Sequence, residues 1–242
     1  MFSGFDRTAL YFGNGYRIND KIELRQPTIG DIVRVGEERY FSTVHCLTSI
    51  PSDAKAALFD LGVDYEEISD FEFFQLMTLG LAPEDSEIFL PGINFSKFEM
   101  RSGDVGLYMY DPDDDIVIDM HIHMIISQFV CMLHGIKKTP ELAGNSYTKK
   151  ILIEEDRDNK ERANGKPRED VLFPLISSVR VYMRCSKEEI LKMGAFEFMD
   201  VVYRTQTIEG VKSLTSAYYS GNLDTKSFDT KKLDAFRDLY KK

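Results

Sequence analysis

The chain has 242 residues, a formal net charge of −10 and a sequence pI of about 5. Its 17 Phe and 12 Tyr, within a hydrophobic fraction of 43%, predict a folded protein, because disordered chains contain far fewer aromatic residues. The averaged acidic field repels phosphate backbones and anionic lipid surfaces, so we expect neither a nucleic acid nor a membrane as partner. Only the tail, residues 226–242, is locally basic.

The cysteine spacing and the hydropathy pattern argue against several kinds of site and segment. Cys46, Cys131 and Cys185 are far apart and form no C-x-x-C pair, which argues against a zinc ribbon or a thioredoxin-type redox site and is typical of a reducing compartment. The first seven residues do not combine a basic region with an apolar one, so we expect no secretory signal. The longest apolar stretch, 116–133, contains an Asp, two His and a Gln and is too polar for a membrane span.

Residues 1–20 are rich in Gly, Asn and aromatic residues and predict an irregular arm. Five rings lie in it, at Phe2, Phe5, Tyr11, Phe12 and Tyr16. Such rings either fold back on the core of the chain or dock on a partner, as an exposed aromatic cluster would.

The rest of an N-terminal part, residues 1–87, predicts short helices. Thr28 and Asp31 have the spacing of a capping box that starts a helix over 28–35, and Gly36-Glu37-Glu38 predicts a turn after it. A second helix is predicted from Asp53 to Gly62, and a third over 70–80.

A β-rich insert is predicted over residues 88–118. Short apolar or alternating runs, at 88–90, 95–100, 105–110 and 116–118, are separated by turn-forming residues such as Pro91-Gly92 and Asp111-Pro112.

The C-terminal part, residues 119–242, returns to helical spacing. Helices are predicted over 119–134 with a stop at Gly135, over 147–163 and over 171–183. A capping box at Ser186 and Glu189 then starts a short helix, and a long helix follows to Ser220-Gly221, with bends expected near Gly194 and Gly210. The fold class is therefore α+β, mainly α-helical, with a small β-rich insert and a long C-terminal helix.

Asp119, His121 and His123 form the one pattern with the residue types of a metal site. On a strand, residues i and i+2 share a face and two imidazoles could bind one ion, but on a helix they point about 200° apart. The helical spacing after Asp119 favours the second arrangement. A metal-dependent enzyme using these three residues remains the alternative function. A third hypothesis, an acidic nucleic-acid mimic or regulatory inhibitor, rests on the net charge alone.

Other chemical motifs are absent from the sequence or incomplete. The run Asp111 to Asp115 lacks the Gly and Glu of a calcium loop and predicts a solvated turn. No phosphate-binding loop or nucleophile elbow occurs, and His134 has the position of a helix C-terminal cation. We therefore predict no catalytic residue, cofactor or metal.

Several segments together resemble small structural proteins of tailed bacteriophages that infect Gram-positive hosts. The segments are Pro27 to Ile32 with Gly36-Glu37 and Tyr40; Pro51-Ser52-Asp53 with Leu58, Gly62-Val63-Asp64 and Phe71 to Phe74; Phe196 to Asp200 with Arg204; and Tyr219 to Lys226. The pattern is similar to tail or baseplate assembly proteins, in particular the baseplate hub assembly family of T-even-like phages.

This resemblance implies a non-enzymatic role in tail or baseplate formation, by scaffolding, chaperoning or incorporation into the particle. The partners would be other phage tail or baseplate proteins. The resemblance does not decide whether the chain also forms a homo-oligomer. The location would be the host cytoplasm during assembly, and for an incorporated component also the virion. The resemblance assigns no role to an individual residue.

Overall fold

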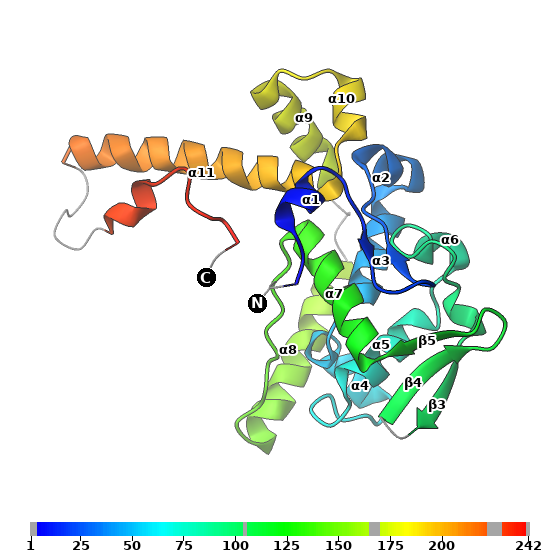
Figure 1. Ribbon diagram of the computed structural model, residues 1–242. Helices are drawn as coiled ribbons and strands as arrows, with labels where there is room; N and C mark the ends of the chain where they lie inside the picture. The colour runs from blue at the N-terminus through cyan, green and yellow to red at the C-terminus, as the bar shows by residue number, and fades with distance from the viewer. Residues whose placement is uncertain (1–3, 104–105, 165–169, 222–228, 241–242) are drawn as a thin grey trace.

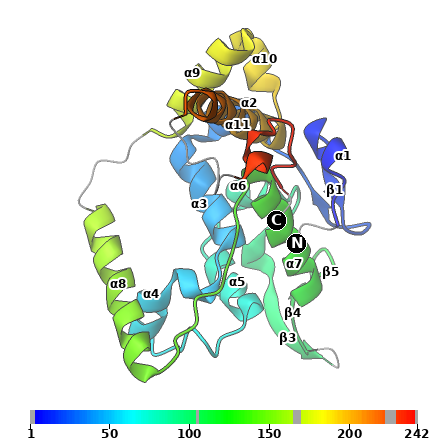
Figure 2. The ribbon, with the colours of Figure 1, turned by 90° about the vertical axis from the view of Figure 1, so that its left-hand side faces the viewer.

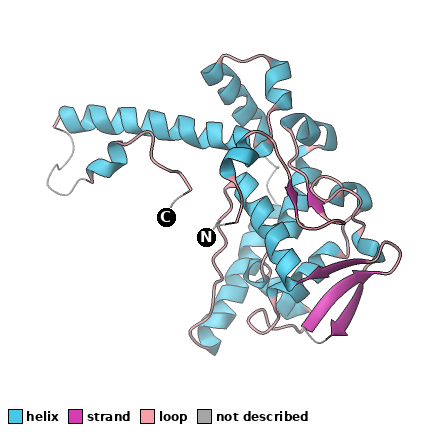
Figure 3. Ribbon diagram, viewed as in Figure 1, coloured by secondary structure: helices cyan, strands magenta, loops and turns pink. Residues whose placement is uncertain are grey.

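The computed structural model describes residues 4–103, 106–164, 170–221 and 229–240. These residues form eleven α-helices, a two-stranded ribbon and a three-stranded antiparallel sheet (Figures 1 and 3). The chain is thus mainly helical with a small β part and a long C-terminal helix, which confirms the predicted fold class.

The N-terminal elements are short. They are α1 (Arg7–Tyr11), β1 (Tyr16–Arg17), β2 (Glu23–Leu24), α2 (Ile29–Val35), α3 (Glu37–Thr48), α4 (Lys55–Asp60), α5 (Asp70–Thr78) and α6 (Pro83–Ser86). Helix α2 begins with the predicted capping box, in which the Thr28 hydroxyl accepts from the Asp31 N–H while the Asp31 carboxylate accepts from the Thr28 N–H. Two otherwise unpaired backbone donors are satisfied in this way.

Helix α3 replaces the turn that the sequence predicts after α2. Gly36 has φ 95°, a conformation that glycine adopts without strain, and α3 begins at the next residue without a side-chain cap. Tyr40, Val44 and Leu47 place its inner face in the core. The missing cap is why the sequence gives no start signal for this helix.

The sheet consists of β3 (Glu99–Gly103), β4 (Gly106–Asp111) and β5 (Ile116–Asp119), in the order β3-β4-β5. The strand predicted over 88–90 is wrong, because this fully buried run forms turns, and 95–97 is a turn of 3₁₀ helix. A short buried apolar run has the same pattern in a strand and in a packed turn.

The C-terminal elements are longer. They are α7 (Met120–His134), α8 (Ser146–Asn164), α9 (Leu172–Met183), α10 (Lys187–Lys192) and α11 (Ala195–Tyr219). Gly135 ends α7 in the left-handed conformation, as predicted, and Ser186 and Glu189 form the capping box of α10. Helix α11 passes through Gly210 as one continuous helix.

One hydrophobic cluster contains residues from the N-terminal part, the β-rich insert and the C-terminal part of the chain. It contains Tyr40 of α3, Phe74 of α5, Met109 of β4, Phe129 of α7 and Phe198 of α11. Helix α7 contacts α3, α5 and α11, while α4 and α8 share a smaller cluster around Ile153. No helix in the described ranges has both the length and the apolar character that a membrane crossing requires.

Helix α11 leaves the body of the molecule. Its first two turns are buried, with Phe196, Phe198, Val201 and Val202 in the core. Its distal half extends well beyond the other helices (Figure 1), and residues 229–240 lie below it in both views (Figures 1 and 2). We call residues 229–240 the C-terminal segment.

Candidate interaction groove on the C-terminal helix

The structure separates the three residues of the alternative metal site. Asp119 is the N-cap of α7, where its carboxylate accepts the Ile122 N–H at 2.8 Å. His121 lies exposed on the first turn, whereas His123 is 5% exposed and faces the core. In the described ranges no three His, Cys, Asp or Glu side chains gather in a group that could hold a metal. The metal-enzyme alternative therefore finds no assembled site here.

His123 is packed between aromatic rings instead. Its ring lies 4.4 Å from that of Phe74 and 5.9 Å from that of Phe71, centroid to centroid. Among the described residues Nδ1 has no hydrogen-bond partner, and burial lowers the pKa of His123 to about 4. The imidazole is thus a neutral core group at physiological pH.

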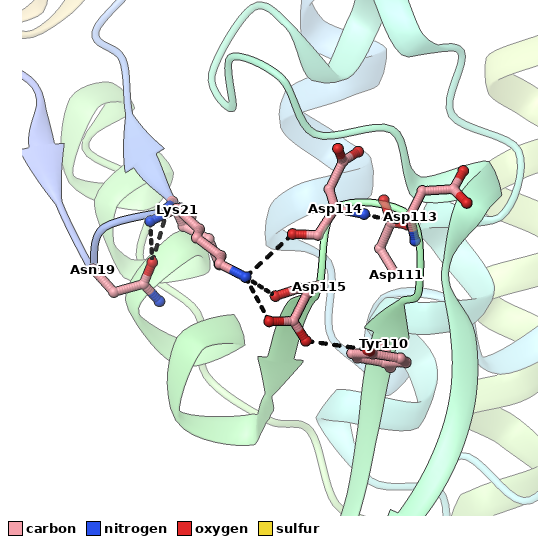
Figure 4. A network of polar contacts seen from close by, with 8 residues as sticks. Asn19, Lys21, Tyr110, Asp111, Asp113, Asp114 and Asp115 are labelled. Atoms are coloured by element: carbon pink, nitrogen blue, oxygen red, sulfur yellow. Dashed lines mark hydrogen bonds and ion pairs between the residues drawn. The ribbon is translucent and has the colours of Figure 1, made fainter.

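The acidic run begins at Asp111, the last residue of β4, and continues to Asp115 through the hairpin turn before β5 (Figure 4). Lys21 donates to the Asp115 carboxylate at 2.7 Å and to the main-chain carbonyls of Asp114 and Asp115, and Tyr110 donates to the other oxygen of Asp115. The Lys21 and Tyr110 hydrogen bonds lower the pKa of Asp115, in that order of size.

The remaining acids of this turn are also engaged. Lys97 pairs with Asp114 at 3.1 Å and with Asp113 at 3.5 Å. Asp111 is buried, and its carboxylate accepts the Asp113 N–H at 2.9 Å. Lys21 and Lys97 thus pair with three of the four carboxylates of this run, and a main-chain N–H contacts the fourth.

Most of the described aromatic arm folds back on the core. Phe5 packs edge-on against Phe129 of α7 at 5.7 Å and against Tyr16 at 4.8 Å. Tyr11 and Phe12 stay exposed, the latter at 76%, and Phe2 lies outside the described residues. Of the two interpretations of this arm, the structure supports packing on the core for Phe5 and Tyr16 and leaves two rings on the surface.

A groove of about 550 Å³ lies between α11, the chain after α7, and the C-terminal segment. One face of α11 forms its floor, through Tyr203, Gln206, Thr207, Gly210, Val211 and Leu214. Its walls are Gly135, Lys137, Lys232, Arg237, Leu239 and Tyr240. We call this the α11 groove.

The C-terminal wall is fixed to the body at several points. Tyr240 stacks on Phe196 at 5.3 Å, and its hydroxyl donates to Asp200 at 3.1 Å. Burial and the Asp200 carboxylate raise the pKa of Tyr240, so the phenol stays protonated and remains a donor. Arg204 of α11 donates to the carbonyls of Ala235 and Arg237.

At the end of the groove nearest the body, a glycine allows the end of α7 to lie close to α11. Gly135 has φ 64°, and a Cβ there would lie 2.8 Å from the Tyr203 ring. The Tyr203 hydroxyl donates to the His134 carbonyl at 3.1 Å, and burial raises its pKa. The α7 terminus and the α11 floor therefore meet without a side chain between them.

The groove can bind an apolar surface together with negative charge, because Val211, Leu214 and Leu239 line it beside Lys137, Lys232 and Arg237. Sequence reasoning located the long helix and the basic tail but gave no signal that the two face each other. Comparison of the chain with protein-family models, with curated proteins and with solved structures finds no match.

Proposed function

We propose that the chain is a non-enzymatic assembly protein that acts through protein–protein contacts in forming a phage tail or baseplate. The observation that carries this proposal is the α11 groove, an open, partly apolar channel on a helix that projects from the body. A projecting helix gives a partner access that a helix within the body lacks.

Exposed apolar side chains on α9 and α10 support the same kind of function. Helix α9 exposes Phe173 at 71% and Val181 at 77%, and α10 exposes Leu191 at 42%. Exposed large apolar side chains on neighbouring elements are typical of protein-binding surfaces. The setting in a phage tail or baseplate comes from the sequence resemblance.

Affinity purification of the tagged full-length chain from phage-infected cells tests the proposal. We expect tail or baseplate proteins to co-purify, with or without the chain itself in purified virions. Presence in mature virions would indicate a component, and absence a transient chaperone. Recovery of no phage protein above the level seen with a tag-only control would overturn the proposal.

A further inference from the structure

The α11 groove has a charge opposite to that of the chain. The formal net charge of the protein is −10, yet the described residues that line the groove include Lys137, Lys232 and Arg237 and no Asp or Glu. When a protein with a net negative charge gathers positive side chains in a concave surface, the electrostatic field there attracts a negatively charged ligand.

The three cations are available to a ligand. In the described part of the chain neither Lys137 nor Lys232 has an ion pair, and both side chains are exposed. Arg237 donates to the carbonyls of Lys232 and Asp234, at 3.1 and 3.0 Å, which orients its guanidinium through main-chain contacts. Its charge is not neutralised by these contacts.

Nearby carboxylates are directed to other partners. Asp238 accepts from Arg7 at 2.7 Å, and Asp200 accepts from the Tyr240 hydroxyl. The Asp234 carboxylate accepts the Phe236 N–H at 2.8 Å. The pair with Arg7 offsets the charge of Asp238, whereas Asp200 and Asp234 keep their negative charge. None of these three carboxylates belongs to the described lining of the groove.

The floor of the groove has the dimensions of a short helix. Tyr203 and Leu214 are eleven positions apart on α11, and at about 1.5 Å per residue they span roughly 16 Å, or three helical turns. Gly210 lies in the middle of this floor, and apart from its neighbours in α11 no atom of the described residues lies within 4 Å of the position its Cβ would take. A glycine here leaves room for close approach, at a cost of about 1 kcal/mol of helix propensity relative to Ala.

We infer that the α11 groove binds an acidic amphipathic helix of a partner protein, about three turns long. Apolar residues of that helix contact Val211 and Leu214, and its carboxylates face Lys137, Lys232 and Arg237. Amphipathic helices bind apolar grooves in this way, and complementary charge fixes their orientation and accelerates association. The inference rests on the proposed protein-binding function and specifies the chemistry of the partner.

Gly210 provides a matched pair of test variants. Gly210→Glu and Gly210→Lys both introduce a good helix former into open space, so both should melt at or above the temperature of the unmodified protein. The probes are two labelled twelve-residue amphipathic helical peptides with identical apolar faces, one carrying four Glu and the other four Lys. A labelled twelve-nucleotide single-stranded DNA is the third probe.

We expect the full-length protein to bind the Glu peptide in preference to the Lys peptide and the DNA. Gly210→Glu should weaken binding of the Glu peptide about tenfold, whereas Gly210→Lys should preserve or strengthen it. Lys137→Glu should also weaken it, while Lys150→Glu on α8, away from the groove, should have no effect. Raising the salt concentration should weaken binding of the Glu peptide.

Four results would overturn the inference. They are equal binding of the two peptides, preference for the DNA, equal effects of the two Gly210 variants, and self-association that Gly210→Glu abolishes. Purification of Gly210→Glu from infected cells separates the two proposals. If it still recovers every phage partner, the groove inference fails and the assembly function stands; if the unmodified chain recovers none, the assembly function itself fails.

Discussion

Arg7 and Asp238 form a two-pronged ion pair across 231 positions of the chain, with nitrogen–oxygen distances of 2.7 and 3.0 Å. The planar guanidinium matches the carboxylate, and the same guanidinium lies 5.8 Å from the centre of the Tyr240 ring. The first helix of the chain thus holds the C-terminal segment, which forms one wall of the α11 groove.

Arg7→Gln should loosen the C-terminal segment without unfolding the protein. Both side chains are about one-third to one-half exposed, and exposed pairs contribute about 0.2–1 kcal/mol. The free energy of unfolding should fall by no more than that, while amide exchange across 229–240 becomes faster. Arg162→Gln, which removes an exposed pair within α8, is the control. Unchanged exchange in the segment would show that Tyr240 and Arg204 hold it alone.

Tyr40→Phe should destabilise the core through His134. The His134 Nδ1–H must donate to the Val130 carbonyl at 2.7 Å, so Nε2 accepts from the Tyr40 hydroxyl, also at 2.7 Å. Without that hydroxyl the buried Nε2 loses its donor, and the free energy of unfolding should fall by about 1–3 kcal/mol in denaturant titrations.

Tyr203→Phe is the matched control for this experiment. It removes a hydroxyl that donates to the His134 main-chain carbonyl from a half-buried position, so the loss should be about 0.5–1.5 kcal/mol. If both variants lost the same small amount, the Tyr40 hydroxyl would not be the necessary partner of Nε2.

Stability should fall as the pH is lowered from about 6.5 towards 4. Burial lowers the pKa of both His123 and His134 to about 4, whereas imidazoles in the unfolded chain titrate near 6.5. Between these values the unfolded state binds more protons, so acid favours unfolding, and the stabilising effect is fully present above this window. Each histidine contributes a slope of at most about 1.4 kcal/mol per pH unit.

His123→Leu isolates one of these contributions. Its curve of unfolding free energy against pH should be flatter than that of the unmodified protein below about pH 6. It should also be more stable at pH 7, because the unpaired Nδ1 is no longer buried. His121→Gln, at an exposed position two residues away, is the control. Parallel curves for His123→Leu and the unmodified protein would disprove the role of His123.

The sequence predicted those elements whose ends are encoded locally. Thr28 with Asp31, Ser186 with Glu189, and Gly135 each mark a terminus through their own hydrogen bonds or backbone conformation. Helix α3 has no side-chain cap, so no local signal in the sequence predicts its start. The strand prediction over 88–90 is wrong because a short apolar run without periodicity has the same pattern in a strand and in a packed turn.

The groove could not be predicted because its walls are distant in sequence. Lys137 follows α7, whereas Lys232 and Arg237 come after α11, and only the tertiary fold places them around one face of α11. The Arg7–Asp238 pair is a contact of the same kind. Composition revealed the basic tail, but the pairing of that tail with α11 depends on the packing of Tyr240 against Phe196.

Deleting residues 1–16 should lower the melting temperature sharply. The deletion removes Leu10, which is 2% exposed, the Phe5 contact with Phe129, and the pairing of Tyr16 with Leu24. Loss of one buried large apolar side chain typically costs about 2–5 kcal/mol.

Gln26 adds to the cost of that deletion. Its buried side-chain amide donates to the Leu10 carbonyl at 2.8 Å, while its carbonyl oxygen accepts from the Phe196 N–H at 3.0 Å. Without the arm the amide group loses its acceptor, which costs about 1–3 kcal/mol more. The expected fall in melting temperature therefore reflects lost core and lost hydrogen bonding, and any fall in partner binding by the truncated protein would be secondary to it.

A gentler change separates docking by the arm from its structural role. Tyr11→Ser with Phe12→Ser alters only the two exposed rings, so the melting temperature should stay within about 2 °C of that of the unmodified protein, as for most surface substitutions. If the α11 groove is the binding surface, co-purification of phage proteins should be unchanged with this double variant and reduced with the Gly210→Glu variant. Loss of partners from the Tyr11/Phe12 variant with an unchanged melt would move the binding surface from the α11 groove to the arm.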